Sequence, residues 1–592
     1  MTETLLPGLL IAVPILGATL PLALGLVRER VGWSVAAVVL AIETAIAAWV
    51  AYAVYVDGAR IVHFLGGGTF GRRGAEGFAV GIELVADALS AIVILLVAAV
   101  SLAVLAFSRR SGPRGNAFYS GYLLLTGGLM GVALTGDLFN MFVFLEITGL
   151  ATYALVASDR SAESAVAALK YLVIGTAGAS LYLVGVGYIF VRTGTLNMVD
   201  VSNSLAGEPE WIEAPLYGEP LVLAAFGFIA VGLLVKAAIY PLHTWQPDAY
   251  ASAPDSVTIY ISALVSTVSA YAFGRIVLNV FTPEFFAVTP IAIEAVLVLA
   301  GLSVVAGSAL AAAQRRIQRM FAYSSVAQFG LIVIAFGIAV HPAGGATATR
   351  FAIYGAMIHL FAHAIIKGGL FATAGAIAAG EGARTVTSYA GVAKQRPFLA
   401  GSIAVLGFGI IGVPPTVGFI GKWYMAVGAV ESGLWAIVLV VFLSTLLTLL
   451  YVARLLEKLY FDYPTEDAPR HSEPSGSIAS EWADALGGSD REMATDGGRG
   501  TDTDDVVADG GGEYSLTVRE GATGPDDAPA PPSVTDVLPD RRDSLSWGMF
   551  GLAVGTAVLA FVLGFAGSEL TAAVDPIVEA VLASEPEVVG DG

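Results

Sequence analysis

Apolar runs long enough to cross a lipid bilayer recur along this chain, and they decide which folds are open to it. Hydrophobic residues make up 56% of its 592 residues and charged residues only 13%. A helix needs about 20 apolar residues to cross the hydrocarbon core. Because lipid cannot satisfy backbone polar groups, runs of this length must be helical. The sequence therefore predicts an all-α polytopic membrane protein.

We expect fourteen spans, of which the first is retained as a helix because it lacks a basic leader region. They cover residues 5–27, 31–56, 79–107, 117–136, 138–157, 165–192, 219–242, 256–280, 288–313, 318–340, 350–378, 398–431, 433–459 and 545–567.

The basic residues of the short loops predict the orientation, because they favour the cytoplasmic side. With both termini outside, the inner loops carry fourteen Lys and Arg residues and the outer loops six. The segment 461–544 is then cytoplasmic. It holds 20 acidic and 6 basic residues, which supplies 14 of the 19 net negative charges. Such a composition predicts a solvated, disordered linker, and a cation-binding regulatory tail is the alternative.

We single out four charged side chains inside predicted spans, where charge is costly and usually functional. They are Glu146, Lys236, Lys367 and Lys422. Glu146 has mainly apolar neighbours, so it should face the bundle interior, as a proton-handling group or in a static ion pair. Lys170, six residues into its span, either reaches the headgroups or lies beside the same pathway.

Prolines follow or precede two of these lysines. Pro241 comes five residues after Lys236, and Pro414 and Pro415 come shortly before Lys422. Proline removes a backbone donor and clashes one turn back, so both helices should be broken. Transporters commonly hold ions at such breaks, and two broken helices indicate two structural repeats. Lys422 has the alternative of extending toward the headgroups.

Two histidines precede Lys367 at helical spacing. His359, His363 and Lys367 are four residues apart, so they share one stripe of a helix. Such a stripe can form a proton wire, since histidine titrates near neutral pH. A hydrogen-bonded packing role is the alternative, and a metal site is disfavoured because no carboxylate or cysteine completes it.

The chain has no cysteine, so it cannot itself hold an iron–sulfur cluster, a thiolate zinc site or a disulfide. We expect no cofactor and no metal, and any redox chemistry belongs to partner subunits. Whether the chain serves an enzyme complex stays open at this point.

Several long motifs occur together in one order: GDLFNMFVFLEI, VKAAIYPLHTWQPDAY, MFAYSSVAQFG, HLFAHAIIKGG and GVPPTVGFIGKW. Over positions 75–460 they resemble the antiporter-like membrane subunits of Mrp-type sodium/proton antiporters and respiratory complex I, most of all the D-type subunit of the Mrp antiporters. The resemblance implies fourteen helices with two inverted five-helix repeats. The expected divisions are 1–115, 116–282 and 283–460 for the three N-terminal helices and the repeats, then the 461–544 linker and the last helix with its tail at 545–592.

The resemblance also implies roles for single residues. Glu146 would be the acid partner of Lys236, and Lys422 the terminal proton-handling lysine. Lys367 with the two histidines would lie on the central axis, supported by His243 and Lys170. Many relatives carry a bridging lysine where this chain has Thr267, so the link from Lys236 to Lys367 would need water held by hydroxyl groups.

Together these features predict a proton-translocating subunit of a multisubunit sodium/proton antiporter in the cell membrane, with other membrane subunits as its partners and no nucleic acid. A pump subunit of a complex I-like NADH or ferredoxin dehydrogenase is the first alternative. A scaffold subunit without a proton path of its own is the second. The sequence leaves the cation and the stoichiometry open.

Overall fold

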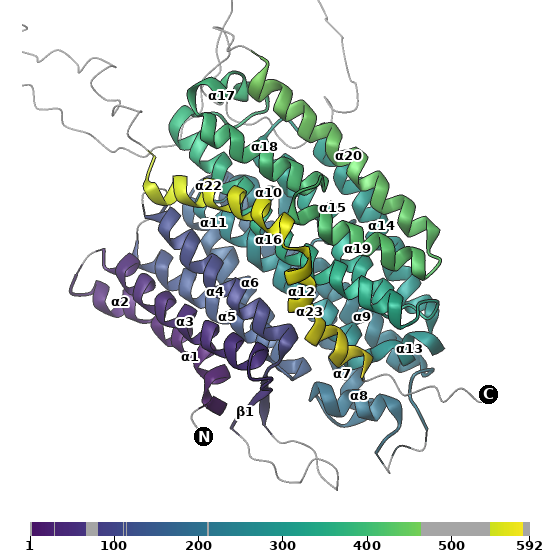
Figure 1. The fold of residues 1–592 in the computed structure, drawn as a ribbon. Coiled ribbons are helices and arrows are strands. Elements are labelled where there is room, and N and C mark those ends of the chain that lie inside the picture. The colour runs from purple at the N-terminus through teal and green to yellow at the C-terminus, as the bar shows by residue number, and fades with distance from the viewer. Residues whose placement is uncertain are drawn as a thin grey trace, which may run out of the picture. The chain divides into compact units, whose positions relative to one another are not determined.

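The structure is a computed structural model, and it describes residues 3–28, 30–66, 81–109, 112–113, 115–209, 212, 214–462 and 545–583. The 461–544 segment therefore lies almost wholly outside the described residues. The described part of the chain is a bundle of helices with one small hairpin (Figure 1). This confirms the all-α fold predicted from the apolar runs.

Within the described ranges, twelve helical stretches are long and apolar enough to cross a membrane, and two shorter apolar helices, Pro220–Lys236 and Pro397–Ile411, begin the two interrupted spans. Together they match the fourteen expected spans. The N-terminal third contains η1 (Glu3–Leu5), α1 (Leu6–Gly17), α2 (Leu20–Gly25), α3 (Gly32–Tyr55), α4 (Ala88–Ser108), α5 (Asn116–Leu134), α6 (Leu138–Val156), η2 (Ala157–Asp159), α7 (Ala162–Thr193) and α8 (Met198–Ala206).

The middle of the chain contains the first interrupted span and the helices that pack on it. They are α9 (Pro220–Lys236), α10 (Gln246–Ser252), α11 (Asp255–Tyr260), the π-helical η3 (Ile261–Val265), α12 (Ser266–Ile276), the π-helical η4 (Val277–Phe281), α13 (Thr282–Val288), α14 (Pro290–Ala313) and α15 (Ile317–Ala339).

The C-terminal third contains the second interrupted span, formed by α18 and α19. Its elements are α16 (Ala346–Glu381), η5 (Thr387–Tyr389), α17 (Val392–Gln395), α18 (Pro397–Ile411), α19 (Val417–Glu431), α20 (Trp435–Tyr460), α22 (Trp547–Val562), η7 (Leu563–Phe565) and α23 (Gly567–Leu582). Figure 1 shows α22 lying across α16 and α18, on which it packs.

One expected span starts too early. Residues 79–107 were predicted as one helix, but Ile82–Ala86 forms strand β2, which pairs antiparallel with β1 (Ile61–Leu65). The helix begins only at Ala88, after Asp87 caps it: the Asp87 carboxylate accepts a hydrogen bond from the Ser90 backbone NH at 2.9 Å. An aspartate at this position ends the strand and starts the helix, because it satisfies a free backbone donor.

Polar contacts between helix ends join residues that are predicted to lie on the same side of the membrane. Arg384 pairs with Asp255 at 3.1 Å, and Arg454 donates to the Ala312 carbonyl at 2.7 Å; all four belong to the predicted inner face. Arg275 pairs with Asp87 at 2.6 Å, on the predicted outer face. The contacts agree with the predicted alternation of the helices across the membrane.

Candidate proton-transfer site

Glu146 and Lys236 form an ion pair inside the bundle. Glu146 lies on α6, and its Oε1 is 2.9 Å from Lys236 Nζ at the end of α9. The lysine side chain is 4% exposed and the glutamate side chain 21% exposed. Burial of the ammonium is tolerated because the carboxylate compensates its charge.

The first predicted break places Lys236 at a helix end. Helix α9 stops at Lys236, and Ala238 has a left-handed backbone with φ of 57°. The segment stays fixed because Trp245 Nε1 donates to the Val235 carbonyl at 3.0 Å and its ring stacks on Tyr171. Lys236 therefore sits where regular helical bonding ends, which confirms the interruption expected from Pro241.

Close packing of α6 on this pair depends on Gly149. A Cβ at this position would lie 3.1 Å from Lys236 Nζ and 2.8 Å from the Tyr153 hydroxyl. Any larger side chain would displace the ammonium or the phenol. Sequence reasoning did not single out Gly149, because the contact crosses from one helix to another.

Lys170 is paired with an acid on the first interrupted span. Its Nζ is 2.6 Å from Asp248 Oδ2 on α10, and Arg319 from α15 approaches Asp248 Oδ1 at 3.2 Å. Asp248 thus bridges two cations from different segments. Of the two alternatives for Lys170, reaching the headgroups and lying beside the pathway, this ion pair favours the second.

His243 lies in the interruption between α9 and α10 and faces α15. It is buried, stacks on the Tyr240 ring at 5.3 Å and contacts the Tyr323 ring edge-on at 5.8 Å. Its Nδ1 has no hydrogen-bond partner among the described residues. Tyr323 directly precedes Ser324 in the chain, and Ser324 binds Lys367. His243 therefore lies on the side of the break that faces Lys367.

Lys367 is fully buried on α16 and is held by neutral groups. Its Nζ donates to the Phe321 carbonyl at 2.8 Å and to Ser324 Oγ at 2.5 Å, both on α15. Within the described ranges, no carboxylate pairs with it. Among the described residues, the ammonium is held by these two oxygens and also lies 5.9 Å from the centre of the Phe321 ring.

The two histidines of the predicted stripe face the same neighbour. His359 Nε2 is 2.9 Å from Gln328 Oε1, and the His363 ring lies 4.4 Å from that of Phe329, both on α15. Neither His363 nitrogen has a hydrogen-bond partner in the described part of the chain. Lys367 lies on the same helix as the two histidines, and α19, which carries Lys422, packs on this helix so closely that a Cβ at Gly421 would lie 2.8 Å from His359 Cβ.

Lys422 is buried and caps the end of α18. Its Nζ donates to the carbonyls of Ile410 and Ile411 at 3.1 and 3.0 Å. The second break was predicted from Pro414 and Pro415, and the structure has it at residues 412–416, where it leaves these carbonyls without helical donors. The alternative that Lys422 extends toward the headgroups is wrong, because its side chain is only 5% exposed and its ammonium is bound to these carbonyls.

Thr267 is buried on α12, which packs on α9, α15 and α16. Its hydroxyl and the Gln246 Oε1 have no hydrogen-bond partner among the residues the structure describes. The neighbouring Ser266 hydroxyl accepts from Gln246 Nε2 at 3.1 Å. Buried polar atoms of this kind usually bind ordered water.

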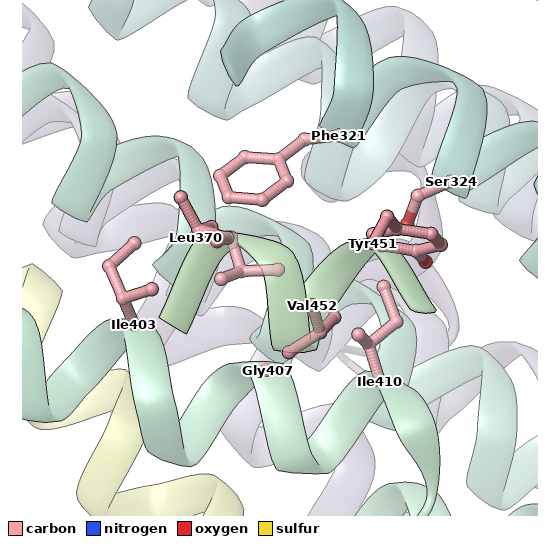
Figure 2. Close-up of a pocket in the computed structure, with 9 residues that line it drawn as sticks. Phe321, Ser324, Leu370, Ile403, Gly407, Ile410, Tyr451 and Val452 are labelled. Carbon is pink, nitrogen blue, oxygen red and sulfur yellow. The ribbon is translucent and has the colours of Figure 1, made fainter. Parts of the chain in front are cut away.

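A cavity lies beside the Lys367 site. Figure 2 shows Phe321, Leu370, Ile403 and Val452 around it, with the hydroxyl-bearing Ser324 and Tyr451 on one side. Ile410, whose carbonyl binds Lys422, also lines it. The cavity is therefore lined by both residues that bind Lys367, Phe321 and Ser324, and by one of those that bind Lys422, Ile410.

The structure brings the predicted residues into two connected groups. Glu146 and Lys236 form one, and Lys367, His363, His359 and Lys422 form the other. Sequence reasoning missed Asp248 as the partner of Lys170, although its motif TWQPDAY was evident. In the described ranges, no group of three His, Cys, Asp or Glu side chains converges as metal ligands would.

Comparison with known proteins shows which family this chain resembles. Residues 135–448 match the family model described as NADH:quinone oxidoreductase/Mrp antiporter, transmembrane. An N-type subunit of NADH-quinone oxidoreductase from Desulforudis audaxviator is 42% identical over 67% of this chain and 76% of its own length. A D-type subunit of a Na(+)/H(+) antiporter from Bacillus subtilis is 32% identical over 67% of this chain and 77% of its own.

A solved chain of the Mrp complex from a Dietzia species shares the fold. It aligns with a TM-score of 0.75 at 24% identity, over 98% of both chains. The family model covers both interrupted spans and all four charged residues predicted from the spans. The chain belongs to the NADH:quinone oxidoreductase/Mrp antiporter transmembrane family.

Proposed function

We propose that this chain is a proton-translocating membrane subunit of a multisubunit monovalent cation/proton antiporter, with Na⁺ as the cation. The observation that carries the proposal is the buried Glu146–Lys236 pair at the end of an interrupted helix. An ion pair inside the membrane is expensive to build and is usually functional. The D-type antiporter relative supports the sodium assignment.

In this proposal the pair alternates between closed and open states. When it opens, Lys236 loses its counter-ion and gives up its proton more readily. The proton then moves toward Lys367, along the histidine stripe and on to Lys422. Each of these three lysines is buried and has a polar ligand in place.

The step from Lys236 to Lys367 passes the region where many relatives carry a lysine and this chain has Thr267. We place this step at His243, because its ring contacts Tyr323 beside the Lys367 ligand Ser324. The Thr267 hydroxyl and Gln246 Oε1, which have no partner among the described residues, supply sites for bridging water. Lys170 and Asp248 flank the same break and tie α7 to α10.

The cation would be carried through contacts with other subunits or coupled by charge repulsion. Na⁺ and similar hard cations need several oxygen ligands, and the part of the chain described by the structure has no cluster of carboxylates for them. The chain therefore acts as one member of a larger assembly.

A second candidate is the pump subunit of a redox complex. The 42% identical relative is an N-type subunit of NADH-quinone oxidoreductase, and this likeness favours it specifically. In such a complex the chain would still move protons along the same residues, while partner subunits carried the electrons. A pure scaffold is disfavoured, because packing alone does not require three buried lysines.

The proposal places the chain in the cell membrane with both termini outside and the 461–544 segment in the cytoplasm. The excess of Lys and Arg in the loops assigned to the inside supports this orientation. The division into two inverted repeats, 116–282 and 283–460, is part of the same proposal, supported by one interrupted helix in each.

The test is gentle purification of the tagged full chain from its native membrane, followed by mass spectrometry of its partners. The antiporter proposal predicts small hydrophobic membrane subunits and sodium-driven proton flux in vesicles. Stoichiometric iron–sulfur or quinone-reducing subunits would instead make it the pump module of a redox enzyme.

A further inference from the structure

Glu43 is a second carboxylic acid inside the bundle, and neither the family motifs nor the proposed pathway includes it. It is the twelfth of 24 residues of α3, which places it about 17 Å from either end of this helix. Its side chain is fully buried, whereas its neighbour Ile42 on the outer face is 47% exposed. Glu43 therefore points into the bundle at mid-membrane depth.

Nothing in the described structure compensates a charge at this position. Neither carboxyl oxygen has a hydrogen-bond partner among the described residues. The elements packed on α3 are α1, α2, α4 and α5. Their only titratable side chains are Tyr119 and Tyr122 on α5, and the charged groups Asp87 and Arg109 lie at the two ends of α4.

An isolated carboxylate in such surroundings is too costly to persist. Transfer of an uncompensated ion into a medium of low dielectric costs many kcal/mol, and the group takes up a proton instead. The neutral acid is then a hydrogen-bond donor that needs an acceptor. Burial without a partner thus points to a bound proton, and to an acceptor nearby.

Hydroxyl groups from α4, α5 and α11 form a cluster, and two of these helices, α4 and α5, pack on α3. Tyr260 at the end of α11 accepts a hydrogen bond from Ser101 Oγ on α4 at 3.0 Å and shares one with Thr126 Oγ1 on α5 at 2.6 Å. Ser101 and Thr126 thus lie on helices that pack directly on α3. We call Ser101, Thr126 and Tyr260 the hydroxyl cluster.

The hydroxyl cluster leads toward the predicted axis. Tyr260 directly precedes η3, a π-helical turn, and η3 precedes Ser266 and Thr267. Single π-helical turns often mark functional sites, because they free backbone groups. The cluster thereby joins the N-terminal helices to the segment between Lys236 and Lys367.

We propose that Glu43 is a proton-binding site, which holds its proton as a neutral acid and exchanges it through the hydroxyl cluster. The site adds one protonatable group to the N-terminal helices, separate from the Glu146–Lys236 pair. It does not depend on whether the chain serves an antiporter or a redox pump.

Infrared spectroscopy of the full chain, purified with its partners, tests this inference. The difference between wild type and Glu43→Gln at neutral pH should show loss of one protonated carboxyl C=O band. The matched control is Glu294→Gln, which removes an exposed carboxylate on α14 and should lose only carboxylate bands. Loss of carboxylate bands in Glu43→Gln would overturn the proposal.

Deuterium exchange tests the second half of the inference. In D₂O the Glu43 band should shift within minutes, and Tyr260→Phe should slow this shift, since it removes one hydroxyl of the cluster. A band that stays unshifted for hours, or an exchange rate unchanged in Tyr260→Phe, would contradict exchange through the hydroxyl cluster. Tyr260→Phe leaves the acid in place, so it carries the test even if Glu43→Gln does not accumulate. These readouts need no transport, so their failure is distinct from failure of the proposed function.

Discussion

At the scale of single residues, the buried lysines are compensated in different ways. Lys236 has a carboxylate at 2.9 Å, whereas Lys367 and Lys422 are held by carbonyl and hydroxyl oxygens. A carboxylate favours the charged form strongly and dipoles favour it less. While its pair with Glu146 is closed, Lys236 is therefore held in its charged form more strongly than Lys367 and Lys422. The direction of the proposed proton movement depends on whether this pair is closed.

Gly149→Ala should loosen the first pair. The added methyl group would lie 3.1 Å from Lys236 Nζ, and overpacking of this kind costs about 1–3 kcal/mol. We expect a lower melting temperature and slower proton exchange in vesicles. The control Gly227→Ala on α9 has no atom within 4 Å of the new methyl and should leave exchange unchanged. Equal melting temperatures and equal exchange rates in the two variants would show that Gly149 does not determine the packing at this pair.

His243→Phe should interrupt the step from Lys236 to Lys367. Phenylalanine keeps a ring that can pack on Tyr323 but has no nitrogen to carry a proton, so the fold should persist while exchange falls to background. Sodium-driven proton flux in vesicles measures this. The control His341→Phe changes a histidine that follows α15, beyond the end of the span. Normal flux in His243→Phe would show that the proton does not pass through His243. The proposed link between Lys236 and Lys367 would then be water bound at Thr267.

At the scale of elements, the two interruptions place lysines differently. The first leaves Lys236 at the last turn of α9, and the second leaves Lys422 as a donor to the last carbonyls of α18. Lys422 thus combines a structural and a proposed proton-carrying role. The two roles can be separated by substitutions that keep or remove the positive charge.

Lys422→Arg should keep the cap and lose the transport. Arginine still donates to the carbonyls of Ile410 and Ile411, but it does not release a proton in proteins. Lys422→Met should lose both, and the unsatisfied carbonyls should lower stability by about 1–3 kcal/mol. Thermal unfolding and vesicle flux, measured on both variants, distinguish the roles. Active exchange in Lys422→Arg would show that this residue carries no proton.

The sequence predicts elements well where one signal dominates. Apolar runs located every span, and prolines located both breaks, because each signal acts locally. The start of α4 was wrong, since IELVA is as apolar as a helix start and only pairing with β1 makes it a strand. Asp248 was missed as a site residue because its partners come from helices distant in sequence. Glu43 was also missed, although it lies inside the predicted span 31–56 and the rule that selected Glu146 applies to it.

At the scale of the whole molecule, loop charges and polar contacts describe the same two faces. Arg384 with Asp255 marks one face, and Arg275 with Asp87 marks the other. This division does not depend on the 461–544 insert. It makes the sidedness of the molecule directly testable.

Because the chain has no native cysteine, a single introduced cysteine is its one site for a thiol-labelling reagent. A cysteine at Lys394 should react with an impermeant thiol reagent only from the cytoplasmic side, and one at Arg60 only from outside. The physical reason is the excess of basic residues on the inner loops. Labelling of intact cells and of inverted vesicles measures this. Reversed labelling would invert the topology and place the insert outside.

In the proposed function, the Glu146–Lys236 pair drives proton movement as a unit. Sodium-driven proton flux in inverted vesicles, measured for Glu146→Gln, Lys236→Met and the double variant at matched abundance, tests it most directly. Lys394→Ala, an exposed lysine, is the control. We expect background flux in both single variants and no further loss in the double variant, because the two residues act together. Flux near the wild-type level in Lys236→Met would contradict it.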